Sequence, residues 1–243
     1  MNWKIRQSKK QPEQVIFALI AVFFLAGCNA DNSVGRDQIE TAFVDSILTT
    51  LTVQDKVGEM TQLTLGALAV GSPYDLVEPQ QLDTAKVRRA LMDYRVGSIL
   101  NCGNHEHSPE KWHEFISGIQ TAAASKPSGI PVLYGVDAIH GATYTAGAVL
   151  GPQQIGLAAT WNTELVRQGA ENTAKEVAAS GIPWNFSPVV DLGRDPRWPR
   201  FWETFGEDPY LASEMGVAMV RGFQEGPSPI AATLKHFLGY GLT

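Results

Sequence analysis

Three short segments of the chain gather carboxylate, imidazole, guanidinium and ammonium groups. They span residues 135–141, 191–203 and 235–236, and each directly follows an apolar run. A carboxylate accepts hydrogen bonds from ligand hydroxyls, and an Arg guanidinium offers a planar fork of donors suited to bidentate contacts. These three polar clusters therefore predict a polar ligand-binding pocket.

The apolar runs before the clusters predict the elements that position them. Residues 130–134, 184–190 and 230–234 are largely apolar, as the strands of a buried parallel sheet are. In parallel α/β folds the active site lies at the carboxyl ends of the strands. We therefore expect all three clusters at one edge of a parallel sheet.

Hydrophobic periodicity and capping residues predict helices between the strands. Thr52 with Asp55, and Ser108 with Pro109, are expected to begin two helices, and Gly181 to end a third. The expected helices are 37–51, 53–65, 84–94, 109–124, 163–180 and 210–224; the expected strands are 96–100, 130–135, 184–190 and 230–235, and 66–81 is expected to be a long loop.

Strands and helices alternate from about residue 96 to the end of the chain, which predicts parallel strands with right-handed crossovers. A (β/α) barrel and an open doubly wound sheet both fit this pattern. No Gly-x-Gly-x-x-Gly turn opens a helix, which argues against a dinucleotide-binding sheet.

Some of the polar residues also have a purely structural interpretation. Asp137 could satisfy backbone N–H groups in a turn, and His140 could orient Asp137 or contact ligand. The density of mixed charge predicts that Arg194, Asp195 and Arg197 form an ion-pair network that holds a long loop.

Lys235 directly follows an apolar run, where an unpaired cation is costly. We therefore expect a carboxylate or a ligand as its partner, and both Lys235 and His236 can reach the pocket rim. Trp198 and Trp202 could stack on the apolar face of a sugar, or could belong to the core.

A metal site is not expected. His105, His107 and His113 lie close in sequence, but their spacing fits neither His-Glu-x-x-His nor a Cys/His finger. A polar loop and an exposed helix start are expected there instead. The sequence has no Walker A motif and no Gly-x-Ser-x-Gly elbow, and we expect no cofactor.

The N-terminus predicts export. Four basic residues precede an apolar segment, Val15 to Ala26, that is too short to span a bilayer comfortably. The segment runs into Leu-Ala-Gly-Cys, which resembles a bacterial lipobox and predicts cleavage before Cys28 and lipid on its sulfur. An ordinary secretory signal with an incidental Cys and a short membrane anchor are the alternatives.

These signals divide the chain into a lipoprotein signal peptide (1–27), a polar tether (28–36) and a folded domain (37–243). Loss of residues 1–27, with four basic residues and one Glu, changes the net charge from −6 to −9. An acidic surface argues against nucleic acid and against a polybasic membrane patch, so the expected contact with a membrane is only the lipid at Cys28.

Cys102, the other cysteine, is expected to be a buried, inert thiol.

Together the motifs resemble glycoside hydrolase family 3, most nearly the bacterial periplasmic β-glucosidases. The resemblance covers roughly residues 37 to 243 and rests on residues 131–141, 191–209 and 235–237, with 56–63 matching the family's N-terminal helix. It implies an α/β fold, a (β/α)8 TIM-barrel-type domain that is incomplete at its C-terminus.

The resemblance also implies the ligand and the reaction. By motif match, Asp137, Arg200, Lys235 and His236 would hold the hydroxyls of a terminal non-reducing β-D-glucosyl unit. Family members hydrolyse such β-glucosides or oligosaccharides with retention, which requires two carboxyl groups about 5–5.5 Å apart.

The sequence departs from the family in its catalytic groups. The family's nucleophile is an Asp in a Ser/Thr-Asp-Trp-type motif, which does not occur in residues 1–243, and the acid/base Glu normally comes from a second domain. We therefore expect a truncated chain whose nucleophile and acid/base would lie beyond Thr243. Leu238 and Tyr240 favour the glucosidase branch over the N-acetylglucosaminidases, which usually carry Pro and His there.

Two hypotheses follow. The first is the N-terminal portion of an exported, lipid-anchored β-glucosidase of the periplasm or cell envelope, inactive by itself. The alternative is a non-catalytic sugar-binding lipoprotein, since the binding residues are present and the reactive ones are not.

Overall fold

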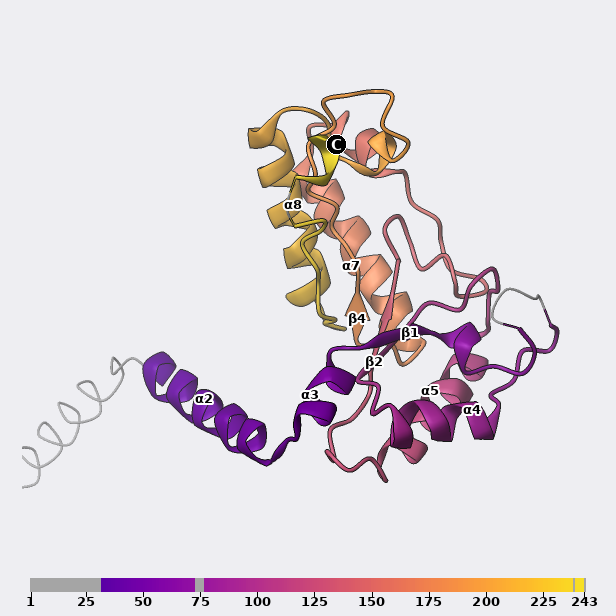
Figure 1. Cartoon of the computed structure of the whole chain (residues 1–243). Helices are drawn as coiled ribbons and strands as arrows, with labels where there is room; N and C mark the ends of the chain where they lie inside the picture. The colour runs from indigo at the N-terminus through magenta and orange to yellow at the C-terminus, as the bar shows by residue number, and fades with distance from the viewer. Residues whose placement is uncertain (1–31, 73–76, 238, 243) are drawn as a thin grey trace, which may run out of the picture. The chain divides into compact units, whose positions relative to one another are not determined.

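The computed structural model describes residues 32–72, 77–237 and 239–242 (Figure 1). The chain divides into two compact units, residues 1–50 and residues 51–243. Within the described ranges, no helix combines the length and apolar character needed to cross a membrane.

In the first unit, helix α2 spans Asn32–Thr50. The expected signal peptide, Cys28 and residues 28–31 of the expected tether lie outside the described residues. Residues 32–36, the rest of that tether, form the first turns of α2. The helix therefore begins five residues earlier than its periodicity predicts.

The second unit is built on a four-stranded parallel sheet. Its strands are β1 (Gln62–Thr64), β2 (Ser98–Leu100), β3 (Leu133–Val136) and β4 (Trp184–Asn185), and they pair in chain order. Parallel bridges Trp184↔Ala231 and Val189↔Lys235 continue the sheet into the last apolar run.

This strand order decides between the two expected topologies. Each strand pairs with the one before it, Leu63 with Ile99 and Ser98 with Leu133 for example. A doubly wound sheet reverses its strand order at a switch point, whereas a barrel adds strands in sequence. The described residues of the second unit therefore form an arc of a (β/α) barrel.

Three long helices lie in the connections: α5 (Pro109–Ala123), α7 (Thr163–Ala179) and α8 (Pro209–Gln224). Helices α7 and α8 pack side by side (Figure 1). The shorter helices are α3 (Val53–Glu59), η1 (Leu65–Ala67), α4 (Thr84–Arg88), η2 (Arg89–Asp93), α6 (Gln154–Ala158), η3 (Phe201–Glu203) and η4 (Tyr240–Leu242).

The expected helix caps are confirmed. Thr52 and Asp55 form a reciprocal capping box at the start of α3, which satisfies backbone N–H groups that the first turn leaves unpaired. The Ser108 side chain caps α5, and Pro109 occupies its first turn. After α7, Gly181 has φ 77°, a conformation that glycine adopts without strain.

Several other boundaries differ from those expected. The strand expected over 130–135 is Leu133–Val136, and the strand expected over 230–235 forms only isolated bridges, at Ala231 and Lys235. The helix expected over 53–65 ends at Glu59, and Gln62–Thr64 instead form β1, because they pair with β2. The strand expected over 184–190 pairs as a ladder only at Trp184–Asn185. Farther along it, the backbone N–H and carbonyl of Val189 bond the buried Gln154 side chain, at 3.0 and 2.7 Å. The bridge to Lys235 uses the neighbouring Pro188 carbonyl and Val190 N–H instead.

A single hydrophobic core of the second unit joins the sheet to its helices. Helix α5 contributes one apolar face, as its periodicity predicts. Among the largest fully buried side chains are Leu65, Leu68, Leu91, Ile99, Trp112, Phe115, Ile119, Tyr134, Phe205 and Phe223. This core supports the strand ends that carry the polar clusters.

Candidate functional site

Asp137 follows β3 and accepts hydrogen bonds on both carboxylate oxygens. Lys235 Nζ donates to Oδ1 at 2.6 Å, and Asn101 Nδ2 donates to Oδ2 at 2.8 Å. The side chain of Asp137 is 31 % exposed and that of Lys235 only 11 %. Lys235 thus has the carboxylate partner that its position after an apolar run predicts.

Backbone pairing fixes the position of Lys235. Its N–H donates to Pro188 O at 3.2 Å, and its carbonyl accepts from Val190 N at 2.8 Å. Because the last apolar run is held beside the preceding one in this way, Lys235 reaches Asp137, 98 residues earlier in the chain.

His236 lies between Asp191 and Arg200. Asp191 Oδ2 accepts from His236 Nδ1 at 2.7 Å and from the His236 backbone N–H at 3.1 Å. Arg200 Nη1 lies 3.0 Å from His236 Nε2. Since a guanidinium only donates, Nε2 is the acceptor in this contact, and we assign the ring proton to Nδ1.

Arg200 makes a bidentate ion pair with Glu203. Its Nε and Nη2 donate to the two carboxylate oxygens at 2.7 and 2.5 Å. This hydrogen bonding raises the pKa of Arg200 above its ordinary value. The guanidinium also lies over the Tyr240 ring, 5.8 Å from its centroid. Glu203 and Tyr240 together therefore fix the orientation of the guanidinium.

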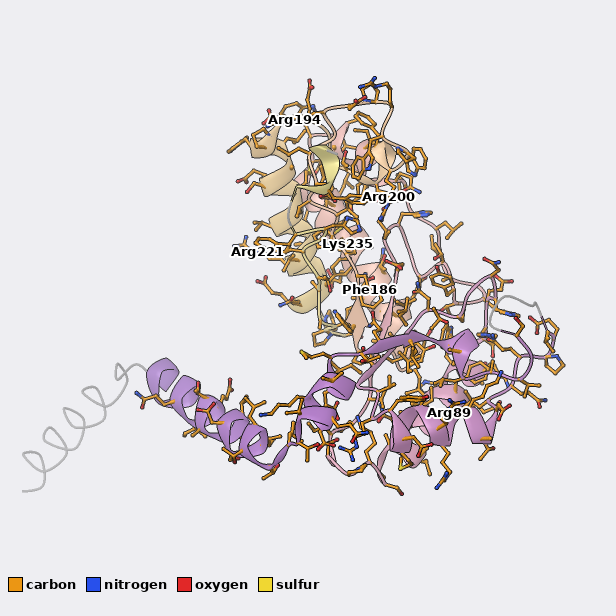
Figure 2. All side chains as sticks on the ribbon, in the orientation of Figure 1. Arg89, Phe186, Arg194, Arg200, Arg221 and Lys235 are labelled. Carbon is orange, nitrogen blue, oxygen red and sulfur yellow. The ribbon has the colours of Figure 1, made fainter. Side chains whose placement is uncertain are left out.

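The four expected binding residues therefore form one connected group. Asp137 contacts Lys235, which is followed by His236, and His236 contacts Arg200. Figure 2 shows Arg200 and Lys235 near each other in the second unit. These side chains come from three segments far apart in the sequence, which meet at the carboxyl ends of parallel strands as expected.

A cavity of about 280 Å³ opens beside this group. Asp191, Arg194, Lys235 and His236 line it, but Asp137 and Arg200 do not. Its other lining residues are Val190, Leu192, Leu234, Phe237, Gly239 and Gly241.

The other residues of the second cluster have different places. Arg197 and Asp195 form the expected ion pair, with Nη2 to Oδ2 at 2.6 Å, whereas Arg194 is exposed and lines the cavity. Trp198 is buried and packs edge-on against Tyr240. Trp202 is half exposed.

His140 does not have the role of orienting Asp137. Its Nδ1 lies 3.2 Å from Gly151 O, and Asn101 is the residue that bonds Asp137 beside Lys235. Asn101, Asp191 and Glu203 support the four expected residues and were not among the expected binding residues. For Asn101 and Asp191 the available signal was their position directly after an apolar run.

The helix start at Ser108 is exposed as expected, but in the loop before it the side chains of His105 and His107 are buried. His105 Nδ1 lies 2.5 Å from Glu78 Oε1, and His107 Nε2 lies 2.8 Å from Gln80 Oε1. Both rings are less than a tenth exposed, because the 77–82 segment covers them. Among the described residues, no group of three or more His, Cys, Asp or Glu side chains could hold a metal ion.

Cys102 is fully buried, as expected. Burial raises the pKa of its thiol to about 12, so the reactive thiolate is scarce at neutral pH. Leu238, used above to favour the glucosidase branch, lies outside the described residues.

Comparison with known proteins identifies relatives of this arrangement. The family model described as "Glycosyl hydrolase family 3 N terminal domain" matches residues 52–243. A lysosomal beta glucosidase of Dictyostelium discoideum is 40% identical over 216 residues, which cover 82% of this chain and 26% of the relative. A periplasmic beta-glucosidase of Salmonella typhimurium is 32% identical over 205 residues, covering 82% and 23%.

Solved structures agree with these sequence matches. An exo-1,3/1,4-beta-glucanase from a Pseudoalteromonas species superposes with a TM-score of 0.69 at 34% identity, covering 83% of this chain and 25% of the other. A beta-glucosidase from Listeria innocua in complex with isofagomine gives 0.62 at 33% identity, covering 82% and 26%. The chain thus spans about a quarter of the length of these relatives.

Proposed function

Because this chain belongs to glycosyl hydrolase family 3, we propose that Asp137, Arg200, Lys235 and His236 bind the terminal non-reducing glucosyl unit of a β-glucoside. In the context of a complete enzyme of the family, this binding would serve the hydrolysis of terminal β-D-glucosyl residues with retention of configuration. The names of the relatives support a β-glucoside as substrate.

The observation that supports this proposal most is the connected polar group at the strand ends. It combines one carboxylate acceptor with a guanidinium, an ammonium and an imidazole. A pyranose presents several vicinal hydroxyls, each of which can donate and accept. A set of donors and acceptors already held in place matches that pattern without reorganising on binding.

The test is a titration of the full chain with D-glucose, in which ligand-observed NMR measures binding. Arg200→Lys removes the bidentate fork that Glu203 holds, and should weaken glucose binding about tenfold. Arg197→Lys is the matched control, because Arg197 is exposed and its ion pair is with Asp195, within its own turn. This substitution should leave glucose binding unchanged.

The stereochemistry of the ligand gives a second control. L-Glucose has the same functional groups in mirror-image positions and should not bind. Equal binding of both enantiomers, or equal glucose affinity of Arg200→Lys and the unsubstituted chain, would contradict the proposal.

We also propose that the chain is an exported lipoprotein. Residues 1–27 would be its signal peptide, Cys28 its lipidated residue and 28–36 its link to the domain, and the periplasmic relatives support export. In bacterial cells fed radiolabelled palmitate, the chain should become labelled, and Cys28→Ser should abolish the label. Unchanged labelling of Cys28→Ser would refute this anchor.

We further propose that the 243-residue chain binds the glucosyl unit without cleaving the bond. This follows from the lack of a Ser/Thr-Asp-Trp motif in its sequence and from the need of the retaining reaction for two carboxyl groups.

A further inference from the structure

We propose that Asn101 is a positioning residue for glucosyl recognition: it fixes the orientation of the Asp137 carboxylate toward the ligand. The inference rests on the proposed function of Asp137. It adds a residue that lies outside the three polar clusters.

Two reciprocal hydrogen bonds connect the residues. Asn101 Nδ2 donates to Asp137 Oδ2 at 2.8 Å, and Asn101 Oδ1 accepts from the Asp137 backbone N–H at 2.8 Å. One amide thus holds both the main chain and the side chain of Asp137. This double contact restricts rotation of the carboxylate about its side-chain torsions.

The backbone of Asn101 is itself anchored. Its N–H donates to Gly135 O at 3.0 Å, and its carbonyl accepts from the buried Tyr134 hydroxyl at 2.7 Å. Its φ of 46° is in the left-handed region, which Asn tolerates better than most residues. This turn directly after β2 keeps the amide next to the end of β3.

The second partner of Asp137 explains why positioning is needed. Lys235 Nζ approaches Oδ1 at 2.6 Å and has little exposure, so it attracts the carboxylate strongly. Without the amide, the carboxylate can turn until both oxygens face the ammonium. With it, one oxygen is held by each partner, and the remaining lone pairs keep a fixed direction for hydroxyl donors.

The first test is Asn101→Gly in the full chain. Gly accepts a φ of 46°, so this variant deletes the amide without straining the turn. We expect glucose to bind about tenfold more weakly in the NMR titration. Asn104→Gly, an exposed position in the same loop, is the matched control and should bind as the unsubstituted chain does.

The second test is Asn101→Asp, which separates positioning from general stability. The new carboxylate faces Asp137, and such a pair shares a proton more readily as the pH falls. The protonated form can donate to Oδ2 as the amide does. Its glucose affinity, relative to the unsubstituted chain at the same pH, should therefore recover between about pH 7.5 and about pH 5.

Other titratable groups face this pair. Lys235 approaches Asp137 from the last apolar run, and burial raises the pKa values of Tyr134, Tyr144 and Cys102, so the last three stay protonated throughout that range. His236 follows Lys235 in the chain. Because the variant and the unsubstituted chain are compared at the same pH, any effect of His236 on glucose affinity is common to both.

The outcomes distinguish this inference from the proposed function. If the unsubstituted chain does not bind glucose, the proposed function fails. If it binds while Arg200→Lys does not, and Asn101→Gly binds normally, the positioning role is overturned. A lack of pH-dependent recovery in Asn101→Asp, with the fold intact by near-ultraviolet circular dichroism, also contradicts it.

Discussion

At the residue scale, the ion pair of Lys235 and Asp137 compensates a nearly buried positive charge in the site. Lys235 is nearly buried, and a buried ammonium without a partner is costly. Asp137 compensates this charge and still has lone pairs available, because Asn101 holds its second oxygen. The pair is therefore oriented before any ligand arrives.

Cys102 allows a prediction at the same scale. Burial both shields its sulfur and raises its pKa to about 12. In Cys28→Ser, which leaves Cys102 as the chain's single thiol, the native protein should not react with 5,5′-dithiobis(2-nitrobenzoate) over minutes. The same protein in denaturant should react fully. Rapid reaction of the native protein would mean that Cys102 is accessible.

At the element scale, contact between α7 and α8 depends on a glycine. A Cβ at Gly222 of α8 would lie 2.6 Å from Ala170 Cβ and closer still to the Arg167 carbonyl oxygen, both on α7. Real Cβ atoms do not approach so closely, so any larger residue would separate the helices.

The matching prediction compares two glycines. Gly222→Ala should lower the free energy of unfolding by about 3 kcal/mol, because overpacking forces backbone shifts. Gly169 lies on the exposed face of α7, where an added Cβ would meet no atom within 4 Å outside the helix's own backbone. Gly169→Ala should therefore raise the free energy of unfolding by about 0.5–1 kcal/mol. Urea denaturation measures both. Equal effects of the two substitutions would show that the helices do not pack as described.

The buried His107 side chain makes the free energy of unfolding depend on pH. Burial lowers the pKa of His107 below its ordinary 6.5, so the unfolded chain binds a proton there that the folded chain does not. The contribution of His107 to the free energy of unfolding is therefore fully present above pH 6.5. It is lost as the pH falls toward the pKa of His107 in the folded chain.

His107→Gln tests this linkage. The Gln amide can still donate to Gln80 but cannot titrate, so the fall in melting temperature between about pH 7.5 and about pH 5.5 should be smaller than in the unsubstituted chain. His113→Gln, at an exposed position, should keep the full pH dependence. The idea fails if both variants behave alike.

At the scale of the whole molecule, the second unit carries the site, and its described residues form an arc of barrel with an apolar groove along α8. The groove has a volume of about 740 Å³ and is lined by residues such as Val217, Val220 and Leu234. Val217 and Leu234 are about half exposed. The group that binds the glucosyl unit in our proposal thus lies at the end of an open arc.

The proposal that the chain binds the glucosyl unit without cleaving the bond leads to a prediction about its activity. The full chain should bind D-glucose yet release no 4-nitrophenol from 4-nitrophenyl β-D-glucoside, since the covalent step needs a nucleophile and an acid/base. The Salmonella relative, assayed in parallel, provides the positive control. Clear turnover by the purified chain would overturn the prediction.

Local sequence signals predicted much of the architecture. The capping box at Thr52, Ser108 with Pro109, and Gly181 each act within a few residues, so their structural outcome does not depend on distant contacts. The polar residues after apolar runs were predicted because a strand end places its next residues at the edge of the sheet.

Only the tertiary structure decided which residues meet. Gln62–Thr64 became a strand because β2 offered a partner 36 residues later, and Gln154 replaced a strand partner for Val189. Asn101 binds Asp137 across 36 residues, and Asp191 binds His236 across 45. By itself, the sequence determined most of the helices and the chemical groups that follow the strands. The pairing of those groups was decided in three dimensions, because hydrogen bonds and ion pairs depend on distances of about 3 Å, which local patterns do not specify.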